Sequence, residues 1–107
     1  MPAAVRLDVD GSTGHDGFKP RPSATSGSTD VFINGHGAVR VSDTWPNHVN
    51  PKQPSSPHVN PHNGVQGTGS GTVFVNGLAL ARIGDTINDE NGSKDACAAG
   101  SPDVFCG

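Results

Sequence analysis

The sequence predicts an all-β fold, a small cone or prism of short strands with pseudo-threefold repeats and almost no helix. Apolar runs of β-branched and aromatic residues recur along the chain, and Asn-Gly pairs follow two of them. No segment shows the 3.6-residue spacing of apolar residues that is typical of a helix. The chain has 107 residues, a length typical of one domain, so we expect a single domain over 1–107.

A repeated segment organises the chain. Residues 27–44 align without a gap with residues 69–86, and both contain Gly-Ser, a Val-Phe run, Asn-Gly, an Arg and an Asp-Thr pair at the same spacing. A shorter copy closes the sequence at 100–107, and a fragment of the second half of the repeat opens it at 4–8. The sequence thus contains about three units, and repeated units of this kind bury a shared core by packing together.

Each unit has the pattern of a β-hairpin. The Val-Phe-Ile and Val-Phe-Val runs are suited to strands. The Asn-Gly pairs at 34–35 and 76–77 suit the type I′ turn, which needs positive φ at both central positions. We therefore expect hairpin repeats over about 28–44 and 70–86 and a half repeat over 100–107.

The composition indicates a thin hydrophobic core. Only 32% of the residues are hydrophobic, and the chain contains 15 Gly and 9 Pro. A domain of this size buries a smaller share of its surface than larger domains do, so a metal ion, disulfides or a partner protein is expected to support the fold. The same composition is compatible with disorder, which the two apolar runs disfavour.

The charge pattern argues against several functional classes. The formal net charge is −3 and the 7 Lys and Arg residues are scattered, so no basic surface for binding nucleic acid is predicted. The first residues lack the apolar run of a secretory signal, and no segment approaches the ~20 apolar residues that span a bilayer. We expect synthesis in the cytoplasm without a signal peptide, and delivery by a larger machine.

Histidine and cysteine residues fall at related places in the units. His15 and His62 each precede an x-Gly-apolar sequence ahead of a hairpin, and Cys97 occupies a shortened version of this slot. His48 follows the return strand of the first unit. If the units surround a pseudo-threefold axis, these four side chains meet at one end of it. Three imidazoles and one thiolate suit tetrahedral Zn²⁺, and a closed set of four ligands is typical of a structural site.

Other interpretations of the histidines stay open. Isolated histidines on loops are usually solvated, and we assign His36, which lies in the first hairpin turn, to the surface. His58 is close to two of the candidate ligands and is an alternative to either His48 or His62.

The two cysteines also have an alternative interpretation. Cys97 and Cys106 form a possible disulfide pair, whose short loop contributes less stability than a structural zinc ion does. Synthesis in the cytoplasm favours thiols over a disulfide. We therefore expect Cys106 to pack in the interior.

The repeat units carry a resemblance to a known family. The Val-Phe-Ile-Asn-Gly and Val-Phe-Val-Asn-Gly segments, the Arg and Asp that follow each, and the closing Gly-Ser-Pro-Asp-Val-Phe resemble the PAAR-repeat proteins. These include the spike-tip proteins of contractile phage tails and of type VI secretion systems. The resemblance covers nearly the whole chain, and the stretches at 12–17 and 42–45 look closest to the phage-tail branch.

The resemblance implies a site and a docking face. The family holds one structural Zn²⁺ near its apex with three His and one Cys, and by position these ligands are His15, His48, His62 and Cys97. The blunt base of the family sits on a trimeric β-helical spike, one copy per trimer, and the apex enters the target cell envelope. Candidates for the docking face, with ordinary core positions as the alternative, are Val31, Val73 and Val104.

Two further functions are compatible with the sequence. The first is an adaptor that docks effectors onto the spike. The second is a small zinc hydrolase, which would need an open zinc position and a carboxylate base such as Asp16 or Asp43. The sequence contains no His-Glu-x-x-His motif and no nucleophile motif. We therefore favour the spike tip, and we expect no catalysis, no small-molecule substrate and no nucleic-acid partner.

Overall fold

The structure is a computed structural model that describes residues 1–50, 62–90 and 92–107. It confirms the all-β prediction, since none of these residues lies in a helix. Within the same ranges there is accordingly no helix with the length and apolarity needed to cross a membrane. The strands described are β1 (Phe32–Ile33), β2 (His36–Gly37), β3 (Thr44–His48), β4 (His62–Gln66), β5 (Phe74–Val75), β6 (Leu78–Ala79), β7 (Thr86–Asp89) and β8 (Lys94–Ala96).

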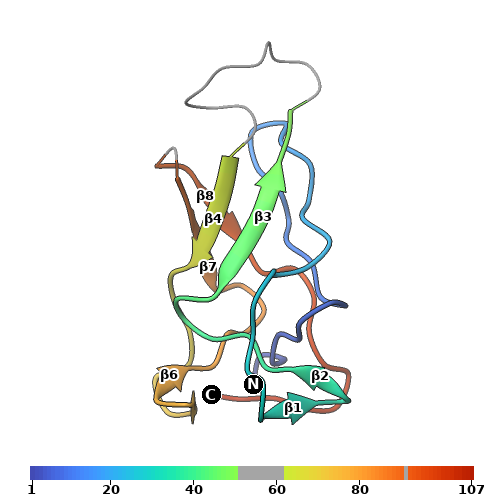
Figure 1. Cartoon of the computed structure of the whole chain (residues 1–107), viewed down its shortest axis with the longest axis vertical. Coiled ribbons are helices and arrows are strands. Elements are labelled where there is room, and N and C mark those ends of the chain that lie inside the picture. The colour runs from blue at the N-terminus through green and yellow to red at the C-terminus, as the bar shows by residue number, and fades with distance from the viewer. Residues whose placement is uncertain (51–61, 91) are drawn as a thin grey trace.

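The molecule is elongated, and its two ends are built differently. It measures 40 × 23 × 22 Å along its principal axes. The antiparallel hairpins β1–β2 and β5–β6 lie at one end, where Figure 1 also places the N- and C-termini. An antiparallel sheet in the order β3-β4-β7-β8 extends toward the other end (Figure 1). We call the first end the hairpin end and the second the sheet end.

The two Asn-Gly turns have the conformation that the sequence predicts. The φ angles are 53° and 81° at Asn34 and Gly35, and 54° and 78° at Asn76 and Gly77. Positive φ at both central residues is the signature of a type I′ turn, which joins strands with the right-handed twist of a hairpin. These turns fix the register of β1 against β2 and of β5 against β6.

A closed ring of backbone hydrogen bonds joins the three units. Val5 N–H donates to Ala81 O at 3.0 Å, Ala81 N–H to Val39 O at 2.9 Å, and Val39 N–H to Val5 O at 3.1 Å. All three residues are fully buried and belong to one apolar cluster. Each unit donates one backbone hydrogen bond to one neighbour and accepts one from the other. The ring therefore relates the three units by an approximate threefold axis, as the repeat predicts.

A buried serine stabilises the turn at the start of each unit. The equivalent residues are Ser28, Ser70 and Ser101. In each case the Oγ accepts hydrogen bonds from the backbone N–H groups two and three residues further along, the second of them at 2.9 Å. These bonds satisfy backbone N–H groups of the turn, and this explains the recurring Gly-Ser in the sequence.

The apolar interior is split into two small clusters, as the composition indicates. One includes Trp45, Ile87 and Cys97, and the other includes Ile33, Val75, Leu80 and Cys106. Both cysteines are free thiols, so the alternative of a disulfide does not apply, and Cys106 packs in the interior as expected.

An ion pair recurs in each unit beside the ring. Arg6, Arg40 and Arg82 bind Asp10, Asp43 and Asp85, with Nε to Oδ2 distances of 2.8, 3.0 and 2.9 Å. In each unit the same Oδ2 also accepts a hydrogen bond from the backbone N–H of the arginine. Each carboxylate therefore fixes both the side chain and the backbone of its arginine, and it closes the bend that leads away from the ring.

This arrangement predicts that Asp85→Asn lowers the stability of the protein at neutral pH. Burial acts to raise the pKa of Asp85, but hydrogen bonds from Arg82 and Thr68 bring it below its ordinary value. A depressed carboxyl pKa stabilises the fold above the unfolded-state pKa of about 4, and the benefit is lost as the pH falls through the folded-state pKa. We expect a loss of about 1–3 kcal/mol at pH 7 that shrinks below about pH 4, measured by urea unfolding.

The matched control is Asp8→Asn. Asp8 is exposed and has positive φ, a conformation that Asn tolerates, so this substitution is expected to leave stability unchanged. Equal stability of the two variants would contradict the role assigned to the recurring ion pair.

Candidate metal centre

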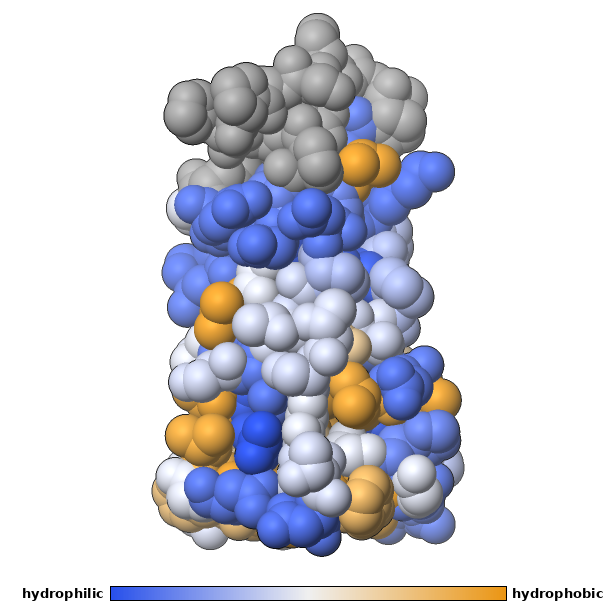
Figure 2. All heavy atoms as spheres, viewed as in Figure 1, coloured by the Kyte–Doolittle hydropathy of each residue, from blue (hydrophilic) through white to orange (hydrophobic). Residues whose placement is uncertain are grey.

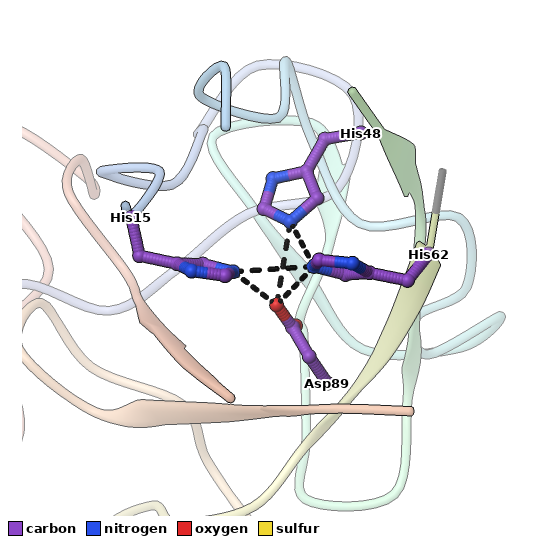
Figure 3. A group of neighbouring side chains, drawn as sticks. All are labelled: His15, His48, His62 and Asp89. Atoms are coloured by element: carbon purple, nitrogen blue, oxygen red, sulfur yellow. Dashed lines mark hydrogen bonds and ion pairs between the residues drawn. The ribbon is translucent and has the colours of Figure 1, made fainter. Parts of the chain in front are cut away.

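Three histidines and one aspartate converge near the sheet end of the molecule. Figure 3 shows His15, His48, His62 and Asp89 pointing toward a common centre. Each offers one ligand atom, and these atoms all lie within 4.8 Å of one another. His48, His62 and Asp89 are buried, and His15 is half-buried.

The sheet positions three of these side chains. His48 at the end of β3 and His62 at the start of β4 are cross-strand partners, and an irregularity in the register lies between Trp45 and His48. Asp89 ends β7, which pairs with β4 on its other side. Neighbouring strands lie about 5 Å apart, so three adjacent strands bring their ligand atoms within reach of one ion.

A third type I′ turn carries the fourth side chain. The central residues Asp16 and Gly17 have φ angles of 50° and 84°, and Phe18 N–H donates to His15 O at 2.7 Å. The turn aims His15 across the end of the sheet toward His62 and Asp89 (Figure 3). An Asp-Gly pair is a common sequence for this turn, which explains the His-Asp-Gly-Phe pattern.

The aromatic ring of Phe18 packs against all three imidazoles. The distances between ring centroids are 5.2 Å to His15, 5.1 Å to His48 and 4.3 Å to His62. Phe18 itself is buried. The ring covers the cluster with apolar surface and limits the rotation of the imidazoles, which is how a ligand set is held ready for an ion.

The ligand atoms have the spacing of a single-ion site. Asp89 Oδ2 lies 2.5 Å from His15 Nε2, 2.9 Å from His62 Nε2 and 3.3 Å from His48 Nε2. His62 Nε2 lies 3.2 Å from His15 Nε2 and 2.7 Å from His48 Nε2. Tetrahedral ligands at the usual zinc distances of about 2.0–2.1 Å are separated by about 3.3 Å. The residues therefore fit one tetrahedral cation.

Hydrogen bonds to the opposite ring nitrogens favour metal-binding tautomers. His48 Nδ1 lies 2.9 Å from Lys19 O, an atom that only accepts, so Nδ1 carries the proton. His15 Nδ1 lies 3.2 Å from Asp16 Oδ2 and donates in the same way. With a cation between Nε2 and Asp89, Nε2 of both residues would be the ligand atom, which is the arrangement that outer-shell acceptors produce around metal ligands.

The electrostatic environment favours a neutral imidazole at His48. Burial lowers the pKa of His48 below its ordinary value, and the positive charge of Arg21 acts in the same direction. A neutral imidazole is the form that ligates a metal, because the proton of the charged form blocks the lone pair.

Cys97, the fourth ligand expected from the sequence, is not part of this cluster. Its side chain lies in the apolar cluster with Trp45 and Ile87, and its Sγ donates to Gln66 Oε1 at 3.4 Å. Trp45 Nε1 donates to the same oxygen at 2.9 Å. Burial raises the pKa of Cys97 to about 12, so the thiol remains protonated. The place expected for a thiolate is taken by the Asp89 carboxylate.

Asp89 was not among the residues that the sequence analysis singled out, although the repeat contains a signal for it. Continuing the alignment past the Asp-Thr pairs matches 43–48 to 85–89 if one residue is skipped in the first unit. The skipped residue falls at the irregularity between Trp45 and His48. Asp89 is then the counterpart of His48, and its burial two positions after buried Ile87 follows the alternation of a strand.

The other residues selected from the sequence lie elsewhere. His36 is in β2 at the hairpin end, outside the cluster. His58, the alternative ligand, lies outside the described residues. Val31, Val73 and Val104 are each 37% exposed, so they are not the buried core positions that were the alternative to a docking face. Asp43 binds Arg40, and Asp16 supports His15.

The comparison with protein families gives a clear result. The family model of the PAAR motif matches residues 19–89, which include both complete hairpin units and three of the four clustered residues. The chain therefore belongs to the PAAR-motif family, whose members are spike-tip proteins of contractile injection systems. This confirms the resemblance predicted from the repeat. No curated protein matches the chain in sequence.

The position of Cys97 predicts that its thiol is unreactive in the folded protein. In a Cys106→Ser variant, Cys97 is the single thiol, and at a pKa of about 12 almost none of it is the reactive thiolate near pH 8. We expect negligible alkylation by iodoacetamide before unfolding, measured by mass spectrometry, both with and without EDTA. Rapid alkylation that appears only after EDTA is added would show that a metal had been bound to Cys97.

Proposed function

We propose that this protein is the metal-stabilised tip that caps a trimeric membrane-piercing spike of a contractile injection machine, such as a phage tail or a type VI secretion system. The observation that carries the proposal is that the two ends of the molecule have different surfaces and different side chains. One end of the elongated fold presents a threefold set of exposed apolar residues, and the other holds a buried cluster of metal-binding side chains.

The hairpin end has the surface expected of a docking face. Val31, Val73 and Val104 occupy equivalent positions and have equal exposure, 37% each. The aromatic residue that follows each valine is also exposed, 58% for Phe32, 58% for Phe74 and 51% for Phe105. In Figure 2 apolar residues gather toward this end, whereas most of the described surface nearer the sheet end is polar.

A trimeric β-helical spike is the partner that this surface suits. By symmetry a trimer presents three equivalent surfaces around its axis, and a monomer with threefold pseudo-symmetry can meet all three in the same way. Exposed apolar residues and short strands would otherwise promote aggregation, so covering them favours the complex. One copy per trimer follows from the single pseudo-axis.

At the sheet end we propose one structural Zn²⁺ held by His15, His48 and His62. The arrangement of the cluster supports Asp89 over Cys97 as the fourth ligand, since the Asp89 carboxylate faces the imidazoles and Cys97 packs in the interior. A closed four-ligand site leaves no position for a reacting water, and this fits a mechanical role in which the tip enters the target cell envelope. No catalytic step is proposed.

Binding of zinc would tie together segments that the small core holds weakly. It joins the turn that carries His15 to strands β3, β4 and β7 at the narrow end of the molecule. Structural zinc sites contribute on the order of 10 kcal/mol to folding, which exceeds the net stability of many small domains. The metal thus supplies rigidity where too few apolar residues are present to provide it.

Removal of the metal is the first test. We expect about one zinc per chain by elemental mass spectrometry and a fall of ten degrees or more in the melting temperature after EDTA treatment. His62→Ala is expected to abolish zinc retention, whereas His36→Ala, at the hairpin end, is expected to leave it intact. A parent protein without zinc, and with an unchanged melting temperature in EDTA, would contradict the metal part of the proposal.

The docking role is tested by substitutions at the hairpin end. The triple variant Phe32→Ser, Phe74→Ser and Phe105→Ser is expected to lose most of its binding to a trimeric β-helical spike from the same source, measured by biolayer interferometry, while its zinc content stays unchanged. The control is Val65→Ser, which removes an exposed apolar side chain from β4. Equal binding by both variants would show that the spike does not contact the hairpin end.

A further inference from the structure

We infer that Arg21 is a positioning residue that holds Asp89 in place as a carboxylate ligand, so that the site binds its metal through three imidazoles and one carboxylate with no thiolate. The inference rests on the metal part of the proposed function and deepens it. Arg21 is a residue that neither the repeat nor the family resemblance singles out.

Arg21 lies beneath the cluster with a side chain that is fully buried. Its Nη2 lies 2.9 Å from Asp89 Oδ1 in an ion pair that lacks the geometry of a hydrogen bond, and its Nη1 donates to Asp95 Oδ2 at 2.7 Å. Nε donates to Pro46 O at 2.6 Å, and Nη2 also approaches His62 O at 3.3 Å. A planar guanidinium bound on several sides has one orientation, so it fixes the direction of each carboxylate that contacts it.

The two oxygens of Asp89 therefore have different partners. Oδ1 faces Arg21, and Oδ2 faces the Nε2 atoms of His15 and His62 at 2.5 and 2.9 Å. Free rotation of the carboxylate would exchange these oxygens, but the guanidinium holds Oδ1 on its own side. Oδ2 is left pointing at the centre of the cluster, which is the geometry that a monodentate carboxylate ligand needs.

Asp95 fixes Arg21 from the opposite side. Its Oδ1 accepts hydrogen bonds from Thr13 Oγ1 at 3.0 Å and from Ala96 N–H at 2.7 Å, so its own position is set by the backbone of β8 and the segment before His15. Arg21 is anchored in addition by its backbone, since Arg21 N–H donates to Ser12 Oγ and Ser12 N–H to Arg21 O, both at 2.9 Å. Arg21 is thus held through both its side chain and its backbone.

The absence of a side chain at Gly64 makes room for this ion pair. Gly64 lies in β4 opposite Asp89. A Cβ at this position would lie 2.7 Å from Asp89 Oδ1, 2.7 Å from Ile87 Cγ2 and 3.4 Å from Arg21 Nη2. At the first two distances any larger residue would displace the side chain of Asp89 or Ile87, so the glycine in the His-x-Gly sequence leaves the space that the Asp89 carboxylate occupies.

The charges of this group favour a divalent cation. Two fully buried carboxylates and one guanidinium leave one negative charge uncompensated when the three imidazoles are neutral. A buried negative charge without a partner is costly, and its Oδ2 atom already lies among three nitrogen ligands. A carboxylate is also a harder ligand than a thiolate, so the site is suited to Zn²⁺, Co²⁺ or Fe²⁺ and less to soft ions such as Cu⁺.

Substitution of cobalt for zinc tests the ligand set in the intact chain. A thiolate ligand gives Co²⁺ an intense charge-transfer band in the near ultraviolet, and a carboxylate does not. We expect the parent and Cys97→Ser to give the same visible spectrum, with no charge-transfer band. Asp89→Cys is the positive control, since it places a thiolate in the cluster and is expected to produce the band. A band in the parent that disappears in Cys97→Ser would overturn the inference.

The rate of metal loss tests the role of Arg21. We expect Arg21→Lys, which keeps the charge but loses the planar fork, to release zinc to a chromophoric chelator about 10- to 100-fold faster than the parent. The matched control is Arg40→Lys, which alters an equivalent type of ion pair outside the cluster and is expected to leave the rate unchanged. Gly64→Ala is a second probe, expected to speed release by displacing Asp89.

The outcomes separate this inference from the proposed function. Release from Arg21→Lys at the rate of Arg40→Lys, with the parent binding one zinc, would overturn the positioning role and leave the metal-stabilised tip intact. Faster release, together with a melting temperature of the metal-free protein equal to that of Arg40→Lys, would support positioning over a general loss of stability. A parent that binds neither zinc nor cobalt would overturn both.

Discussion

The ring of three backbone hydrogen bonds between Val5, Val39 and Ala81 is the constraint on which the rest of the structure depends. It joins three segments that are distant in sequence, and it leaves the side chains of these three residues in one apolar cluster. Because every unit enters and leaves the ring in the same direction, the turns that precede the ring gather at one end of the molecule. The segments that follow the recurring Arg–Asp pairs run toward the other.

The hairpin end could be predicted from the sequence in large part, because its structure is determined by local chemistry that recurs from unit to unit. Gly-Ser gives the buried serine, Asn-Gly gives the type I′ turn, and Val-Phe gives one exposed pair per unit. Each of these features depends on residues a few positions apart. The repeat then places equivalent turns together without any long-range contact having to be inferred.

The sheet end could be predicted only in part, because there the units differ. His15, His48 and His62 were selected from their positions in the repeat, and the structure brings them together. Asp89 was missed since the irregularity in β3 shifts the first unit by one residue and hides its correspondence with His48. Cys97 was misplaced since the third unit is shorter: its N–H donates to Asp85 O, and its side chain packs in the apolar cluster that includes the ring residues.

The two ends of the molecule differ in how closely they follow the threefold repeat. A partner with threefold symmetry is met best by three equal surfaces, and the equal exposure of Val31, Val73 and Val104 meets that demand. The four side chains of the candidate metal centre instead come from two kinds of position, since His15 and His62 share one place in the repeat and Asp89 corresponds to His48. Two units therefore supply most of the cluster, and the threefold pattern is not kept at this end. Asp89 differs from the histidines in its contact with Arg21, which lies between the opening fragment and the first full unit, so the proposed positioning role of Arg21 applies to this one ligand.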